Sequence, residues 1–129
     1  MELFTKGELE VMRVLWEHGE LTPPQIEERF PRPIGNAALR SVLLVLMEKG
    51  HVVRTRMGKA YVYSARTPLE KELRGTIRRI SDIFFGGSTK SLIARLLEDE
   101  KLTEDEIREL RDVAGRRIRK ADEAKGGRR

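Results

Sequence analysis

The sequence predicts a mainly α-helical protein with one small β-hairpin. Over most of the 129 residues, apolar side chains recur every three or four positions, the period of a helix with one buried face. Between residues 51 and 65 the period changes to two, in a stretch rich in Val, Tyr and Thr that is typical of paired strands. Thr-x-x-Glu/Gln motifs, whose side chains satisfy each other's backbone amides, mark four helix starts, at Thr5, Thr22, Thr67 and Thr103.

The composition favours a chain that completes its burial by oligomerising. Charged residues make up 36% of the chain and aromatic residues 5%, which leaves little apolar area per residue. A chain of 129 residues holds one compact domain, or a small domain with an appendage, and this excludes one large enzyme core. The net charge of +5 suits a polyanionic partner, because Lys and Arg neutralise phosphates.

Several further classes of protein are disfavoured. With no cysteine, the chain has no disulfide, thiolate metal site or cysteine nucleophile. The longest apolar stretch, Val42 to Met47, is too short to span a membrane, and the first residues lack the pattern of a signal peptide. We therefore expect a soluble, cytoplasmic protein with no membrane partner.

The first two predicted helices have clear boundaries. The first runs from the Thr5 cap to Gly19, and its expected buried stripe is Leu9, Met12, Val14, Leu15 and Trp16. The second begins after Thr22, with Pro23 at the first helical position, where a missing N–H costs nothing. Its inward residues are Ile26 and Phe30, and the prolines that follow prevent its continuation.

A third helix and the hairpin complete the first half of the chain. The helix starts near Gly35-Asn36 and runs to Lys49-Gly50, with a core stripe of Leu39, Val42, Leu43 and Leu46. Its opposite face carries Ala37, Ser41, Leu44 and Glu48, flanked by Arg40 and Val45. The predicted strands are His51 to Arg56 and Ala60 to Ala65, separated by Met57-Gly58-Lys59.

The second half predicts three more helices. The first starts at the Thr67-Pro68 cap and carries a narrow apolar seam, which suits packing against another helix: Leu69, Leu73, Ile77, Ile80 and Phe84. Gly86-Gly87-Ser88 ends this helix. A short helix follows with Leu92, Ile93, Leu96 and Leu97, and then a last helix with Ile107, Leu110, Val113 and Ala114. After Gly115 the stripe is lost, so the basic C-terminal tail is expected to fray.

This order predicts two domains and a homodimer. The boundary is expected near Thr67, with one domain over residues 1–66 and a helical dimerisation domain over residues 67–129. Burial of each seam side chain contributes about 1.5–3 kcal/mol, so the whole seam is able to exceed the cost of association. The residues expected in the dimer interface are Leu69, Leu73, Ile77, Ile80, Phe84, Leu92, Leu96 and Leu97.

Three helices followed by a hairpin form a winged helix-turn-helix, whose third helix enters the DNA major groove while the hairpin, or wing, lies along neighbouring phosphates. From Pro31 to Arg66 there are seven cations and a single anion, whereas residues 1–30 hold seven carboxylates and three cations. The positive charge therefore lies on the elements that would touch DNA. The candidate residues are Arg40 and Ser41 on the third helix, and Arg54, Arg56 and Lys59 on the wing.

Other interpretations of these residues stay open. The wing cations also suit protection of an exposed sheet edge against aggregation, and Arg40 also suits covering the core with its stem. Asn36 is as well suited to capping the third helix as to reading a base. The alternative function is a winged-helix adaptor that docks a partner protein on Ala37, Leu44 and Val45.

No catalytic residue, metal ligand or cofactor is predicted. His18, at a helix end, and His51, at a strand start, lack the ordered nucleophile, base and orienting partner of a catalytic site. The acidic run Glu98-Asp99-Glu100 has no ligand spacing and is expected to form a solvated turn. We therefore expect a binding protein and not an enzyme.

Three motifs carry a resemblance to a known family. They are Leu9 to Trp16, Leu39 to Leu43 with Glu48-Lys49-Gly50, and Gly86-Gly87-Ser88 with Leu102 to Ile107. Together they resemble the penicillinase-repressor family of bacterial regulators, the BlaI/MecI/CopY type, from about Phe4 to Val113. The resemblance implies a homodimeric winged-helix protein that binds double-stranded DNA and represses a promoter by occupying a dyad operator.

The sequence also departs from that family. The family's DNA-facing positions fall on Ala37, Ala38, Ser41 and Val45, where members with known operators usually have Lys, Thr, Thr and Arg, so the resemblance does not extend to the penicillinase operator. A membrane sensor protease inactivates family members at an Asn-Phe bond, and the matching pair here, Arg95-Leu96, argues against that route of induction. Copper-responsive members carry a terminal cysteine cluster, which this chain lacks.

Overall fold

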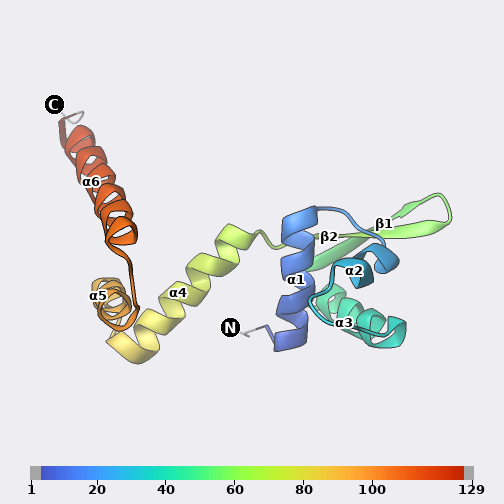
Figure 1. Ribbon diagram of the computed structural model, residues 1–129. Coiled ribbons are helices and arrows are strands. Elements are labelled where there is room, and N and C mark those ends of the chain that lie inside the picture. The colour runs from blue at the N-terminus through green and yellow to red at the C-terminus, as the bar shows by residue number, and fades with distance from the viewer. Residues whose placement is uncertain (1–3, 127–129) are drawn as a thin grey trace. The chain divides into compact units, whose positions relative to one another are not determined.

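The computed structural model describes residues 4–126, which form six α-helices and one two-stranded antiparallel sheet (Figure 1). In chain order the elements are α1 (Lys6–His18), α2 (Pro23–Arg29), α3 (Asn36–Glu48), β1 (Val52–Met57), β2 (Ala60–Ala65), α4 (Leu69–Phe85), α5 (Thr89–Asp99) and α6 (Glu104–Gly126). The predicted mainly α fold, a winged helix-turn-helix followed by three helices, is confirmed. The backbone divides into compact units of residues 1–77 and 78–129, and the domain boundary at residue 66 stays a prediction.

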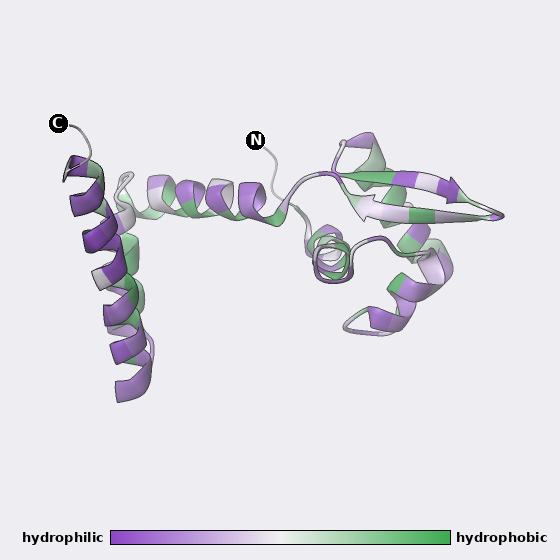
Figure 2. Cartoon of the chain, turned by 90° about the horizontal axis from the view of Figure 1, so that it is seen from above, coloured by the Kyte–Doolittle hydropathy of each residue, from purple (hydrophilic) through white to green (hydrophobic). Residues whose placement is uncertain are grey.

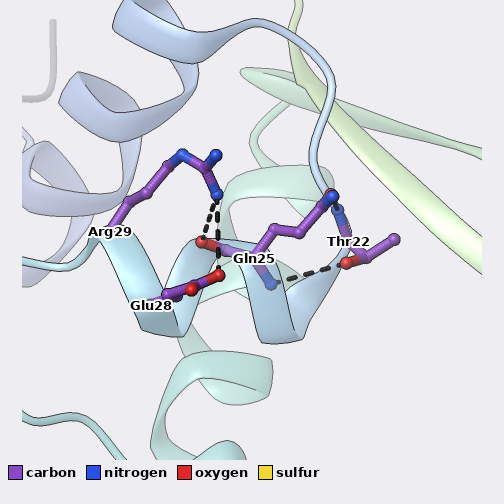
Figure 3. Close-up of polar contacts among 4 residues, drawn as sticks. All are labelled: Thr22, Gln25, Glu28 and Arg29. Carbon is purple, nitrogen blue, oxygen red and sulfur yellow. Dashed lines mark hydrogen bonds and ion pairs between the residues drawn. The ribbon is translucent and has the colours of Figure 1, made fainter.

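Reciprocal capping boxes mark where three of the helices begin. The Thr5 hydroxyl accepts from the amide of Glu8, and the Glu8 carboxylate accepts from the amide of Thr5 at 2.8 Å. Thr22 and Gln25 form the same reciprocal pair at the start of α2 (Figure 3). Thr103 and Glu106 form it at the start of α6, as predicted.

The predicted cap at Thr67 is wrong, because this residue is used to join elements. Its hydroxyl lies 2.7 Å from Nδ1 of His51, and its carbonyl accepts from Nε1 of Trp16 at 2.9 Å. The ring of Phe4 packs edge-on against both His51 and Trp16. Through these contacts, the segment around Thr67 that leads into α4 packs against helix α1 and the base of the hairpin.

The hydrophobic core of the first unit lies between α1, α2, α3 and the base of the hairpin. Its fully buried side chains include Val11, Met12, Leu15, Ile26, Leu39, Leu43, Leu46 and Val52. The predicted stripe of α1 is wrong at Leu9, which is 40% exposed, and it omits Val11. The inward row starts at Glu8 and continues with residues 11, 12 and 15, so Leu9 is turned toward the edge of the helix.

The hairpin has a shorter turn than the sequence suggested. β1 starts at Val52 and extends to Met57, which pairs with Ala60 across the two-residue turn Gly58-Lys59. Gly58 has φ of 64°, the left-handed value that a II′ turn requires at its first central position. The loop between α1 and α2 pairs with β2 through an isolated bridge between Leu21 and Tyr63.

The three C-terminal helices bury little apolar surface within one chain. Hydrophobic residues run along one side of α4 (Figure 2), and the seam side chains Leu69, Leu73, Ile77, Ile80 and Phe84 are between 37% and 73% exposed. Within residues 78–126, no apolar side chain is fully buried. The expectation that the chain frays after Gly115 is wrong, because helix α6 continues to Gly126. Residues 127–129 lie outside the described part.

Among residues 4–126, no helix combines the length and the apolarity that crossing a membrane requires.

A buried ion pair connects the start of α1 to the end of α3. The Glu8 carboxylate is buried and lies 3.0 Å from Nζ of Lys49. Burial by itself raises the pKa of Glu8, but the hydrogen bonds from the Thr5 amide and from Lys49 outweigh it and hold this pKa below its ordinary value of 4.5. The ionised carboxylate therefore stabilises the folded state.

We expect Glu8→Ala to lower the free energy of unfolding by about 2 kcal/mol at neutral pH, because both the cap and the ion pair are lost. Glu8→Gln keeps a capping acceptor and should lose about half as much. The folded-state pKa is lowered, so the contribution is complete above about pH 5 and disappears as the pH falls through that pKa. Urea unfolding followed by circular dichroism at several pH values measures this. The exposed Glu20→Gln is the control, and a Glu8→Gln deficit that persists or grows in acid would contradict the account.

Candidate nucleic-acid interface

A hollow of about 380 Å³ lies between the first turns of α2 and α3 and the hairpin. Its lining brings together four of the sequence-predicted DNA-binding residues, Asn36, Arg40, Arg54 and Lys59. The remaining lining residues are Thr22, Pro23, Pro24, Ala60, Tyr61 and Tyr63. Three cations from a helix and a strand pair therefore share one concave surface.

Two tyrosines on β2 support the cations of β1. The register pairs Arg54 with Tyr63 and Arg56 with Tyr61, so all four side chains lie on the same face of the hairpin. The Arg54 guanidinium lies 4.2 Å from the centre of the Tyr61 ring, and that of Arg56 lies 6.0 Å from it. A hydrogen bond with Tyr63 raises the pKa of Arg54, so this guanidinium stays charged.

The role of Tyr61 and Tyr63 was not foreseen from the sequence. The sequence shows that the two tyrosines alternate with the other residues of β2. It does not show which residue of β1 lies opposite each tyrosine, because that depends on the strand register. A turn of three residues, as the sequence suggested, would have shifted this register. The two-residue turn places each tyrosine directly opposite an arginine.

The outward face of α3 is largely apolar and exposed. Ala37, Ala38, Arg40, Ser41 and Val45 are all accessible, and Leu44 is 52% exposed. The Ser41 hydroxyl donates to the carbonyl of Ala37 at 3.0 Å, so its lone pairs are left for an incoming donor. This face therefore offers few hydrogen-bonding groups.

The capping interpretation of Asn36 is wrong. The residue before it, Gly35, is the N-cap of α3, and this helix end has no hydrogen bond from a capping side chain. Asn36 is the first helical residue, and its exposed side chain borders the hollow. It is therefore placed where a polar ligand can reach it.

Two of the seven cations between residues 31 and 66 form ion pairs with carboxylates of α1. Arg32 forms two hydrogen bonds of 3.1 Å with Glu10, which raise the pKa of Arg32 and lower that of Glu10. Lys49 is paired with Glu8. The cations that make no ion pair within residues 4–126 are Arg40, Arg54, Arg56, Lys59 and Arg66. The sequence count therefore overstates the charge that is available to a ligand.

The two histidines contact neighbouring side chains of the fold. His51 is held by Thr67 and Phe4, and His18 lies beside Glu17 on the surface at the end of α1. In the described part of the chain, no three His, Asp or Glu side chains are grouped so that they could hold a metal ion.

Comparison with known proteins identifies relatives along most of the chain. The family model described as penicillinase repressor matches residues 4–116. A penicillinase repressor from Bacillus licheniformis is 24% identical over 109 residues, which cover 83% of this chain and 85% of that protein. The methicillin resistance regulatory protein MecI of Staphylococcus aureus (strain N315) is 24% identical over 115 residues, which cover 88% of this chain and 94% of that protein.

A solved structure shows a similar fold. The crystal structure of the YusO protein from Bacillus subtilis superposes with a TM-score of 0.50 at 23% identity, over 89% of this chain and 74% of that one. This likeness concerns the fold alone.

Proposed function

Because the chain belongs to the penicillinase repressor family, we propose that it is a DNA-binding transcriptional repressor that occupies a dyad operator as a cytoplasmic homodimer. The observation that carries the proposal is the concave surface at which Arg40, Arg54 and Lys59 meet without a carboxylate partner in the described chain. Phosphates are the ligand that fits such a surface, since cations that are not already paired release counterions from DNA when they bind.

Each element has a distinct role in the proposed complex. Helix α3 enters the major groove with Asn36, Ala37, Ala38, Ser41 and Val45 toward the bases. Arg40 and the wing cations Arg54, Arg56 and Lys59 contact the phosphates on either side. The tyrosine rings hold the two wing arginines in place, which lowers the entropy lost when those side chains bind.

Sequence recognition in this proposal is sparse at each half-site. Three of the five residues on the reading face are Ala or Val, which contact the methyl group of thymine and make no hydrogen bond to a base. Specificity therefore rests to a large degree on the spacing of two half-sites and on the shape of the DNA.

The second copy in the proposed dimer packs on the C-terminal helices. The unit after residue 77 has no fully buried apolar side chain of its own within the described residues, and α5 and α6 border an apolar hollow of about 700 Å³. The seam on α4, with Leu92, Leu96 and Leu97 on α5, supplies the apolar surface that a partner would cover.

We infer that Arg95-Leu96 is a poor cleavage site for a sensor protease. This bond lies inside α5, and Arg95 forms an ion pair with Asp99 at 2.7 Å. Cleavage there would require α5 to unfold locally first.

We expect Arg54→Ala/Lys59→Ala to weaken binding to duplex DNA and to reduce the slope of log affinity against log salt by about two per bound chain, since about one unit is lost with each phosphate contact. Fluorescence anisotropy at several salt concentrations measures both quantities. The control is Arg32→Ala, which removes one positive charge that is already paired with Glu10, and its slope should stay near that of the unmodified protein. A salt-independent affinity would instead favour the adaptor that docks a protein on Leu44 and Val45.

We expect Ser41→Ala to relax the preference for one base pair in each half-site by about fivefold or more, because the Ser41 oxygen would no longer accept from a base amino group. Ser41→Thr keeps the hydroxyl and is the matched control. Sequencing the duplexes that each variant retains from a randomised pool reports the preference. An unchanged motif with Ser41→Ala would remove this residue from the reading face.

We expect Leu73→Glu/Ile80→Glu to convert the dimer into a monomer of 14.9 kDa, because two charges would be placed in the apolar seam. Light scattering at micromolar concentration measures the mass. Arg78→Glu, on the opposite side of α4, is the control and should stay dimeric. A monomeric mass for the unmodified protein would refute the proposed dimer.

A further inference from the structure

Helix α6 has an uneven distribution of charge. Its first half begins with Glu104, Asp105 and Glu106 and is acidic, whereas residues 115–126 contain five cations and two carboxylates. Four of these cations fall within five residues: Arg116, Arg117, Arg119 and Lys120. We call these four residues the basic cluster of α6, and all of them are exposed.

The stability of the helix does not account for this cluster. Cations favour the negative end of the helix dipole, but that effect is confined to the last turn, and α6 continues for six residues beyond Lys120. Neighbouring carboxylates do not account for it either. Within residues 4–126, none of the four side chains forms an ion pair, although Asp112 and Glu123 lie four residues from Arg116 and Arg119 respectively.

Most of the basic cluster lies beyond the part of the chain that matches the family model. The match to the penicillinase repressor model ends at residue 116, where the cluster begins. Arg116, Arg117 and Lys120 lie at the edge of the apolar hollow between α5 and α6, so their stems can cover apolar surface while their charged ends reach solvent. The cluster is thus a concentrated, unpaired positive charge on a folded helix.

We propose that the basic cluster of α6 is a second DNA-contacting surface, which binds phosphates without reading sequence and adds to the affinity of the winged helix. The inference rests on the proposed function, because the winged helix supplies the DNA. A duplex held at the wing presents further phosphates to a tethered basic helix at high effective concentration. A dimer would supply two such helices.

The test compares three forms of the full-length chain on a random-sequence duplex of about 40 bp, between about 50 and 300 mM salt. The cluster variant is Arg116→Gln/Arg117→Gln/Arg119→Gln/Lys120→Gln, and Gln is chosen because it retains helix propensity. The matched control loses four exposed cations elsewhere: Lys71→Gln/Arg74→Gln/Arg78→Gln/Lys90→Gln. Circular dichroism and light scattering compare the helix content and the mass of each variant with those of the unmodified protein.

We expect the cluster variant to reduce the salt slope by at least about two per bound chain and the affinity at about 100 mM salt by at least tenfold. The control should change the slope by less than one. An equal effect of both variants would show that net charge alone matters, and it would overturn the inference. So would a slope that the cluster variant leaves unchanged, or a loss of dimer mass in that variant, which would assign the cluster to the subunit interface.

Two further outcomes separate this inference from the proposed function. If the unmodified protein does not bind duplex DNA, the proposed function itself fails. If it binds DNA and the cluster variant binds equally well, but that variant alone loses binding to vesicles that contain anionic phospholipid, the cluster serves a membrane surface and the inference fails by itself.

Discussion

The arrangement of the concave cationic surface depends on two backbone hydrogen bonds between Leu21 and Tyr63, with lengths of 3.0 and 2.7 Å. They attach β2 to the loop between α1 and α2 and bury Tyr63 against the core. Because side chains alternate across a strand, this attachment decides which face of the hairpin turns toward α3. Arg54 and Arg56 share the face of Tyr63, while Val53 and Met57 lie on the other. The bridge therefore helps to place Arg54 and Lys59 on the same hollow as Arg40.

Charge in this protein has two separate uses. Arg32 and Lys49 pair with carboxylates of α1, and these pairs connect the loop before α3 and the end of α3 to that helix. The wing cations and Arg40 form no such pairs in the described chain, and they keep their charge for a ligand. The same residue types are thus paired within the chain or keep their charge available, according to whether a carboxylate lies within reach. A count of charges along the chain therefore does not measure the charge that is available to a partner.

The two units differ in how much of their apolar surface they bury by themselves. The first has a core that its own helices and hairpin close, with Met12, Ile26 and Leu43 almost completely buried. The described part of the second has apolar seams along its helices and no fully buried apolar side chain, which is why we propose that a second copy covers these seams. In the proposed complex, such a dimer would also set the spacing between two copies of α3, which would compensate for the few polar groups on the outward face of that helix.

The sequence by itself determined the local features: the helix order, three capping boxes, the core stripe of α3 and the presence of the hairpin. These features follow from periodicity and from side-chain contacts within four residues, and both are visible in the sequence. The tertiary structure alone decided that Leu9 turns outward, that Thr67 binds His51, that Tyr61 supports Arg54, and that Arg32 is neutralised by Glu10. The physical reason is that packing and strand register bring together residues far apart in the chain, and no local pattern specifies such pairs.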